Sequence, residues 1–236
     1  EFFDPVEQIT GVISFATHPA KLFAPDKAPK LLTTQTEKLA LMSSFRLSYA
    51  LLLPFDHKLA EMEGMRFVEE ILIDRLGVRH LVVGYDTRFG KGLDTDVARL
   101  EVIGRMYGFD VEVIPAVKIG DKPVSSSIIR SFIEKGDLKS AASYLGRPYS
   151  VQGEVVRGQG LGRRLGVPTA NLNIDPVKLL PGNGVYTARC LTQQGKYKCA
   201  VNIGVRPTIP QQNPPRVVEA HLIGFDGDLT GQTVTI

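Results

Sequence analysis

The six residues from Gly166 to Asn171, GVPTAN, place a hydroxyl and a carboxamide two positions apart, directly after a basic, glycine-rich run. Mg²⁺ prefers oxygen ligands, keeps several of its waters and bridges the phosphates of its substrates. We therefore predict that Thr169 and Asn171 bind Mg²⁺ beside a nucleotide polyphosphate. An ordinary Pro-Thr turn without a ligand is the alternative interpretation.

The preceding run, from Gly153 to Leu165, contains four glycines and three arginines. Glycine lets backbone N–H groups approach an anion without interference from a Cβ, and arginine adds fixed positive charge beside them. The run is therefore typical of a phosphate-binding loop. The nucleotide-binding residues predicted around it are Gly158, Gly160, Gly162, Arg163, Gly166 and Pro168.

Glu219 lies in the run from Val217 to Leu222, VVEAHL, in which apolar and polar residues alternate. In a strand this alternation places Glu219 and His221 on one face and the apolar residues on the other. A solvated strand face is the usual meaning of such a pattern. If the polar face borders a ligand, Glu219 becomes a candidate general base for a hydroxyl.

A second set of candidates follows predicted strands in the first part of the chain. The run from Gly84 to Gly92 comes directly after an apolar strand, where open α/β sheets bind ligands. It offers Asp86 and Phe89, and the Phe89 ring could stack on a planar group. A glycine-rich turn with a basic tip is the equally weighted alternative.

Ser125, Ser126 and Ser127 stand at the start of a predicted helix, with Arg130 one turn further on. Free N–H groups at a helix start attract phosphate, although capping by a serine is the commoner explanation. His18 ends the first predicted strand, where we consider it a candidate phosphate contact. A capping or merely exposed histidine is the alternative.

Two parts of the sequence follow different periodicities. From residue 11 to about 145, short β-rich runs alternate with helical ones, which predicts a parallel sheet covered by helices. One predicted helix begins at a Thr34–Glu37 capping box, and its apolar face is Leu39, Met42 and Phe45. After residue 147 the strands are separated by Gly and Pro, which predicts a small β-barrel or sandwich. Strands are expected at 12–15, 49–53, 80–84, 111–114, 151–156, 184–191, 197–203 and 217–223.

Composition excludes several classes of protein. Of the 236 residues, 43% are hydrophobic and 22% charged, and no apolar run is long enough to span a bilayer. The net charge of +3 argues against nucleic acid as a partner. Cys190 and Cys199 flank a predicted hairpin, and we expect two reduced thiols in a cytoplasmic protein; a cross-strand disulfide is the alternative.

In order along the chain, these motifs closely resemble the bacterial bifunctional riboflavin kinase/FAD synthetase family, from about Gly11 to the last residue. The resemblance implies a Rossmann-like nucleotidyltransferase domain, residues 1–146, and a riboflavin kinase-like β-barrel, residues 147–236. The matching residues are Phe15 with His18 and Pro19, Leu32 to Lys38, Gly84 to Gly90, Ser125 to Arg130, Leu145 to Tyr149, the glycine run into Asn171, Gly184 to Tyr186, Asn202 to Gly204 with Arg206 to Thr208, and Glu219.

The resemblance also implies roles for these residues. In the kinase half, Thr169 and Asn171 hold Mg²⁺ against ATP, the loop from Gly158 to Gly166 covers the phosphates, and Glu219 accepts the proton of the riboflavin 5′-hydroxyl. In the transferase half, FMN is joined to the AMP of ATP to give FAD. There Ser126 and Arg130 bind ATP phosphates, with Ser125 beside them. Phe15, Asp86 and Phe89 border the flavin.

The sequence departs from the family pattern at three places. The family's Gly-x-Phe-Asp-Gly-x-His-x-Gly-His element has no counterpart, and we expect it in the encoded protein between Thr10 and Gly11. Ala16 and Thr17 stand where the family has Asp and Pro. The kinase half stops at Ile236, short of the family's final segment. A kinase with a degenerate transferase half, and a flavin- or nucleotide-binding module without turnover, are the alternative hypotheses.

Overall fold

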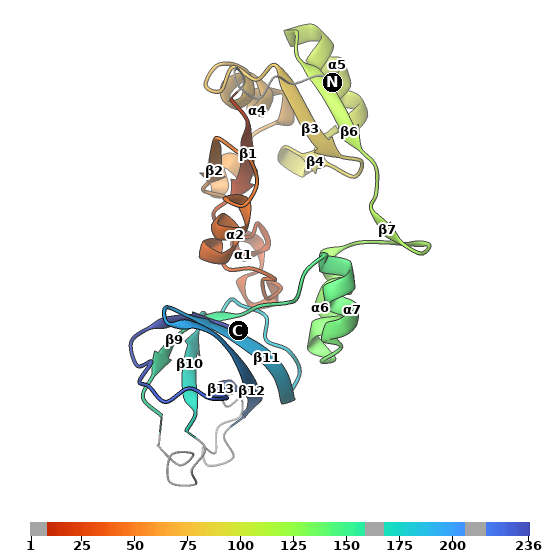
Figure 1. The fold of residues 1–236 in the computed structure, drawn as a ribbon. Helices are drawn as coiled ribbons and strands as arrows, with labels where there is room; N and C mark the ends of the chain where they lie inside the picture. The colour runs from red at the N-terminus through yellow and green to blue at the C-terminus, as the bar shows by residue number, and fades with distance from the viewer. Residues whose placement is uncertain (1–8, 159–167, 206–215) are drawn as a thin grey trace. The chain divides into compact units, whose positions relative to one another are not determined.

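The computed structural model describes residues 9–158, 168–205 and 216–236. Contacts within the chain group it into two units (Figure 1). The first comprises residues 1–29 and 42–124, and the second comprises residues 30–41 and 125–236. The segment 30–41 therefore packs with carboxyl-terminal residues that lie more than eighty positions away in the sequence. The domain boundary expected at residue 146 stays a prediction.

The first unit contains two pairs of parallel strands, in agreement with the predicted α/β class. Strand β1 (Gly11–Phe15) pairs with β2 (Tyr49–Leu53), and β3 (His80–Gly84) pairs with β6 (Asp110–Ile114). All four strands fall on the β-rich runs from which they were predicted. The structure thus has two separate parallel two-stranded sheets within this unit, among the described residues, where the sequence suggested one parallel sheet.

Helices cover the β3–β6 pair and supply most of the core. Helix α5 (Val97–Tyr107) begins at Asp96, whose carboxylate accepts from the backbone N–H of Arg99 at 3.0 Å, and it ends at Gly108 with a φ of 74°. The apolar run predicted as one helix up to Gly77 forms α4 (Gly64–Phe67), which continues as a π-helix over Val68–Ile73. Both helices bury their apolar side, with Val68, Leu72, Leu100 and Ile103 at the centre.

The remaining elements of the first unit are short. They are α1 (Ala20–Phe23), a 3-10 turn at Pro25–Lys27, α3 (His57–Ala60), β4 (Arg88–Phe89), a 3-10 turn at Lys91–Leu93, β5 (Thr95–Asp96), β7 (Lys118–Ile119) and β8 (Lys122–Pro123).

The second unit contains a closed antiparallel barrel of six strands, which confirms the predicted β-barrel. The strand from Ala170 was not predicted, because Thr169 to Asn171 was interpreted as a turn. Closure leaves no free strand edge in the barrel. In pairing order the strands are β10 (Ala170–Ile174), β13 (Arg216–Leu222), β12 (Gly195–Val205), β11 (Gly184–Thr192), β14 (Thr233–Thr235) and β9 (Gln152–Val156).

Alternation along β13 fills the barrel core. Val218, Ala220 and Leu222 are buried, so Glu219 and His221 lie on the outer face, as their spacing predicted. The same cluster includes Val155 of β9, Leu172 of β10 and Val201 of β12, among others. The barrel therefore presents alternate residues of each strand to its surface, where a site can form.

Three helices accompany the barrel. Helices α6 (Ser126–Glu134) and α7 (Leu138–Leu145) are separated at Gly136, as predicted. Helix α2 (Gln35–Met42) begins at the predicted capping box, in which the Thr34 N–H donates to Glu37 Oε2 at 2.8 Å and the Glu37 N–H donates to Thr34 Oγ1 at 3.2 Å. Phe45 was wrongly placed on its apolar face. The helix ends at Met42, and Phe45 is 67% exposed.

The β11–β12 hairpin places Cys190 and Cys199 inside the barrel as free thiols. Burial, together with the neighbouring Cys190, raises the pKa of Cys199 to about 11. The thiolate is the reactive form of cysteine. We therefore expect the two thiols of the native protein at pH 8 to react with a disulfide-containing reagent at least about 100-fold more slowly than those of the unfolded protein. Absorbance of the released thiol measures both rates. A thiol titre of zero in denaturant would instead show a disulfide.

No helix among the described residues combines the length and apolar character that a membrane span requires.

Candidate active sites

The barrel of the second unit contains a cavity of about 400 Å³. It opens where β9 ends and β10 begins, and the loop that follows β13 forms its other side. Most of the predicted kinase residues that the structure describes lie here. The cavity is lined by residues 155–158, by residues 168–171, by Ala220 and Leu222, and by Phe225 and residues 227–230.

Thr169 and Asn171 both line this cavity. Thr169 precedes β10, and Asn171 is the second residue of that strand, directly opposite Val156 of β9. The backbone of Gly158 lies against the Asn171 side chain. A Cβ at Gly158 would overlap the Asn171 Nδ2 atom and lie 2.8 Å from its Cγ. A side chain at this position would therefore displace the carboxamide.

Glu219 lies beside Asn171 on the outer face of the barrel. Asn171 is directly opposite Glu219 in the β10–β13 pair, and Glu219 is directly opposite Asn202 in the β12–β13 pair. Side chains of directly opposed residues share a face, with Cβ atoms about 4.5–5.5 Å apart. Three polar side chains thus form a row across β10, β13 and β12. Glu219 borders Asn171 without itself lining the described part of the cavity.

Asn202 was not predicted as a site residue, although it belongs to one of the motifs that carry the family resemblance. Its exposed side chain follows Glu219 in the row across the barrel. The only signal in the sequence was an asparagine within an apolar strand, between Val201 and Ile203. Its place beside Glu219 depends on strand register, which sequence alone does not fix.

His221 supports the turn that carries Thr169. Its Nδ1 lies 2.8 Å from the carbonyl oxygen of Pro168. A carbonyl oxygen only accepts, so Nδ1 carries the proton in this contact and Nε2 is left as the acceptor of the neutral ring. Pro168 has no N–H of its own to anchor this turn. The contact from His221 to its carbonyl oxygen restrains Pro168, the residue directly before Thr169.

Several predicted nucleotide-binding residues fall on part of the chain that the structure does not describe. They are Gly160, Gly162, Arg163 and Gly166.

In the first unit, Phe15 is the last residue of β1, and its ring contacts Phe55 edge to face, with centroids 5.0 Å apart. Phe55 in turn contacts Phe23, which is 66% exposed. His18 Nδ1 accepts from the backbone N–H of Ala20 at 3.2 Å, which is the capping alternative for this residue. An aromatic group with a neighbouring histidine thus follows the carboxyl end of β1.

Asp86 and Phe89 follow the carboxyl end of β3, where ligands of parallel sheets bind. Phe89 packs against the core, with its ring centroid 5.4 Å from that of Phe67. One side of the Phe89 ring is therefore already in use for packing. Asp86 lies in the turn after Gly84, close to that strand end.

The serine cluster belongs to the second unit. The Ser125 side chain caps α6 and accepts from the Ile128 N–H at 3.4 Å, and Ser126 is the first residue of the helix. The Arg130 Nε donates to the Lys30 carbonyl oxygen at 3.0 Å. Capping and attachment of the segment 30–41 are thus the contacts that this cluster makes in the structure.

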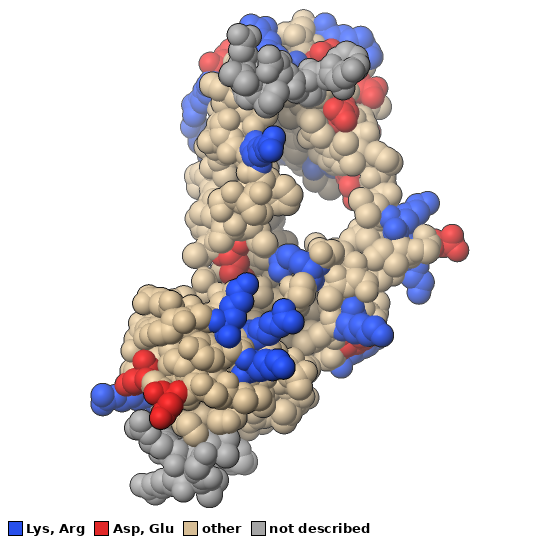
Figure 2. All heavy atoms as spheres, viewed as in Figure 1, with Lys and Arg blue, Asp and Glu red and all other residues tan. Residues whose placement is uncertain are grey.

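On the face drawn in Figure 2, most of the surface is uncharged, and Lys and Arg side chains lie in small groups. Among the described residues, no three His, Cys, Asp or Glu side chains are arranged to hold a metal ion.

Comparison with known sequences assigns both units to enzymes. The FAD synthetase family model matches residues 6–128, and the riboflavin kinase model matches residues 145–236. The bifunctional riboflavin kinase/FMN adenylyltransferase of Escherichia coli K12 is 36% identical over 230 residues, which span 95% of this chain and 71% of that protein. The chain belongs to this bifunctional family.

A second member of the family agrees with this assignment, and a solved structure shares the fold. The Pseudomonas fluorescens bifunctional riboflavin kinase/FMN adenylyltransferase is 34% identical over 225 residues, covering 95% of this chain and 71% of that protein. A crystal structure titled macrolide-efflux protein, from Streptococcus pneumoniae, shares the fold, with a TM-score of 0.83 and 24% identity over 96% of this chain and 73% of that one.

Family membership decides between the hypotheses left open by the sequence. Matches to both family models support the bifunctional enzyme over a kinase with a degenerate transferase half, and over a module without turnover. The chain is therefore an enzyme with a riboflavin kinase region and an FAD synthetase region. Its barrel carries the kinase region, which includes the cavity, Asn171 and Glu219.

Proposed function

We propose that riboflavin is phosphorylated to FMN at the cavity of the barrel, with Asn171 and Thr169 as magnesium ligands and Glu219 as the general base. The observation that carries this proposal is the register of β10 and β13. It pairs Glu219 directly with Asn171, a residue that lines the cavity, so the two side chains share one face of the barrel. A base and a phosphate-binding group must be neighbours for a phosphoryl transfer to a hydroxyl.

The residues present fit a magnesium ion. Thr169 offers a hydroxyl oxygen and Asn171 a carbonyl oxygen, the ligand types that Mg²⁺ accepts while it keeps several waters. The missing Cβ of Gly158 leaves the space that the Asn171 side chain occupies at the cavity wall. When bound, the ion neutralises charge on the phosphates of ATP.

Glu219 then has one task in the kinase reaction. Its carboxylate accepts the proton of the riboflavin 5′-hydroxyl as that oxygen bonds to the γ-phosphorus of ATP. The bond from this phosphorus to the oxygen that bridges it to the β-phosphate breaks, and ADP leaves. Asn202, next in the row, is placed to orient the carboxylate from its other side.

The glycine-rich loop completes the kinase site in this proposal. Gly158 and Pro168 line the cavity at the two ends of the loop. Gly160, Gly162, Arg163 and Gly166 lie between them, and we assign them to the ATP phosphates because glycine-rich backbone and arginine suit phosphate oxygens.

For the transferase reaction, which adenylylates FMN to FAD, we propose Phe15, Asp86 and Phe89 as the residues that border the flavin. Each lies at or just after the carboxyl end of a parallel strand in the first unit. His18, Ser126 and Arg130, with Ser125, are assigned to ATP phosphates on the resemblance alone. We place both reactions in the cytoplasm.

Gly158→Ala tests the kinase site, because the added methyl group must displace the Asn171 side chain. We expect the kcat of riboflavin phosphorylation to fall about 10- to 100-fold, since small misplacements of a positioning group have effects of this size. FMN adenylylation should stay unchanged. The measurement is FMN and FAD formation from riboflavin and from FMN with Mg-ATP, followed by chromatography.

Gly204→Ala is the matched control, because a Cβ at Gly204 on β12 meets no atom of the described residues within 4 Å. Both variants are compared by circular dichroism to verify the fold. A Gly158→Ala enzyme as active as Gly204→Ala would mean that the carboxamide position does not matter for phosphorylation. The kinase site would then have to be sought elsewhere in the protein.

A further inference from the structure

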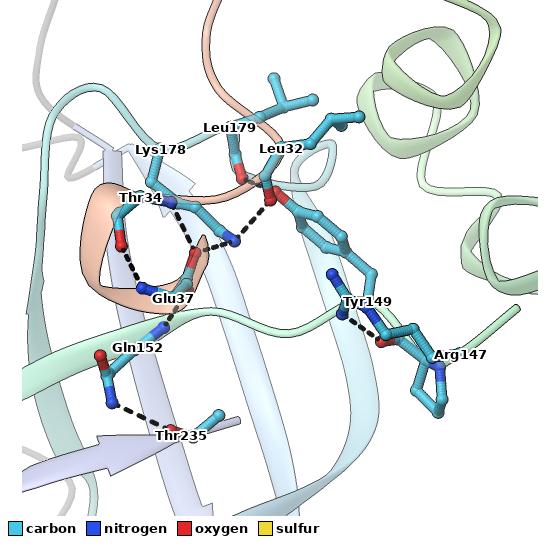
Figure 3. A network of polar contacts seen from close by, with 10 residues as sticks. Leu32, Thr34, Glu37, Arg147, Tyr149, Gln152, Lys178, Leu179 and Thr235 are labelled. Carbon is cyan, nitrogen blue, oxygen red and sulfur yellow. Dashed lines mark hydrogen bonds and ion pairs between the residues drawn. The ribbon is translucent and has the colours of Figure 1, made fainter. Parts of the chain in front are cut away.

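The segment 30–41 lies within residues 6–128, which match the FAD synthetase family, but it packs with the unit that contains the riboflavin kinase match. Figure 3 shows how it joins the barrel. Both backbone and side chains make this attachment.

The backbone of the segment pairs with the chain that follows β10. The Leu31 N–H donates to the Val177 carbonyl oxygen at 2.7 Å, and the Leu179 N–H donates to the Leu31 carbonyl oxygen at 2.9 Å. These bonds form a parallel bridge between Leu31 and Lys178. The Lys30 ammonium donates to the Pro176 carbonyl oxygen at 2.6 Å. An isolated β-bridge thus attaches the segment to the chain that follows β10.

A buried ion pair follows directly. The Lys178 Nζ lies 2.6 Å from Glu37 Oε2, with side chains only 1% and 9% exposed. The same Nζ donates to the Leu32 carbonyl oxygen at 2.8 Å and lies 4.6 Å from the centre of the Tyr149 ring (Figure 3). Burial lowers the pKa of Lys178, and the hydrogen bond that its ammonium donates to Glu37 opposes that shift.

The Glu37 carboxylate is satisfied on both oxygens. Oε2 accepts from Lys178 and from the Thr34 N–H, and Oε1 accepts from the Gln152 N–H at 3.1 Å. Removing one partner of such a buried pair leaves an uncompensated charge and is strongly destabilising. The barrel residue Lys178 therefore depends on a carboxylate from the segment 30–41.

The same carboxylate holds a strand of the proposed kinase site. Gln152 is the first residue of β9, and that strand runs from there to Val156, beyond which Gly158 packs against Asn171. Residues at the far end of β9 line the cavity. Glu37 thus fixes the beginning of the strand whose end supports the magnesium ligand.

We infer that residues 30–41 are a structural part of the riboflavin kinase, although they match the FAD synthetase family, and that Glu37 is the counter-ion which the kinase barrel needs for Lys178. The partner of Lys178 is thus an acidic residue in the first turn of α2, from the same chain. The inference concerns the fold of the barrel, so its stability test does not depend on the roles proposed for Asn171 and Glu219.

Glu37→Gln in the full-length protein is the first test, since it removes the charge and keeps the shape. We expect the temperature of half-inactivation of riboflavin kinase to fall by about 10 °C, and amide exchange in β9 and β14 to accelerate about 100-fold. Exchange in β3 and β6 of the first unit should change less than about threefold. Heat-treated kinase assays and hydrogen exchange by mass spectrometry provide these values.

Glu61→Gln is the matched control, because it breaks an exposed pair with Lys91 whose side chains are 63% and 58% exposed. We expect its kinase inactivation temperature to fall by no more than about 2 °C. Equal effects of Glu37→Gln and Glu61→Gln would overturn the inference. So would faster exchange in β3 and β6 as large as that in β9.

A rescue variant separates the charge effect from general damage. Glu37→Leu with Lys178→Met removes both charges, and buried pairs replaced by apolar residues are often no less stable. We expect this double variant to regain part of the kinase stability lost in Glu37→Gln and to stay below the parent protein, because the N–H groups of Thr34 and Gln152 still lack their acceptor. If Glu37→Gln does not fold and the double variant does, the inference holds. A double variant no more stable than Glu37→Gln overturns it.

Discussion

Glu219→Gln is expected to lower the kcat of riboflavin phosphorylation by about 100- to 10,000-fold, the range over which a general base contributes. The amide keeps the size of the side chain and loses the ability to take the 5′-hydroxyl proton. Glu219 lies outside the barrel core, so the substitution should leave the fold intact. The KM for riboflavin and for ATP should change far less than kcat, because the lost interaction belongs to the transition state.

Glu154→Gln provides the comparison for this substitution. Glu154 is an exposed residue of β9 and lies opposite Asn173 and Thr233, away from Glu219 in the register of the barrel. The same loss of charge there should leave kinase turnover within about twofold of the parent enzyme. If Glu219→Gln retained more than about a third of the parent kcat, Glu219 would not be the base.

Asn171→Ala should lower the kcat of the kinase about 100- to 1,000-fold, because a bound metal ion supplies several kcal/mol of charge stabilisation. The loss should shrink as the concentration of Mg²⁺ rises, since a weakened site needs more metal to fill. FMN adenylylation should be unaffected. Initial rates of both reactions across a magnesium titration give the comparison.

Asn173→Ala is the control for Asn171→Ala, since it makes the same change two residues further along the same face of β10. Asn171→Asp, which keeps an oxygen ligand, should recover part of the activity. A magnesium dependence identical in Asn171→Ala and the parent enzyme would contradict the assignment of Asn171 as a metal ligand. The substitution could then act only through packing against Gly158.

Local patterns predicted much of this fold. The alternation around Glu219 placed Val218 and Ala220 in the core, and the Thr34–Glu37 spacing located the start of α2. Both depend on contacts within a few residues, which sequence periodicity records directly. The same reasoning overextended α2 to Phe45, because an apolar residue at helical spacing was given a core role that the short helix cannot provide.

Contacts between distant residues were not predictable in the same way. Glu37 was recognised as a capping residue, but its second partner, Lys178, lies 141 residues further along the chain. A lysine is expected at the surface, so nothing in the sequence around Lys178 indicates its burial. Likewise, the row from Asn171 through Glu219 to Asn202 depends on the pairing of three strands and not on any local motif.

The distance between Glu37 and Lys178 along the chain also has a temporal side. Because Lys178 lies 141 residues after Glu37, a ribosome that adds about 5–20 residues per second incorporates Glu37 roughly 7–28 s before Lys178. During that interval α2 has no barrel to join, and helices of its length are marginal by themselves. The second unit can therefore assemble only late in translation, after residues near its beginning have waited in an unpaired state.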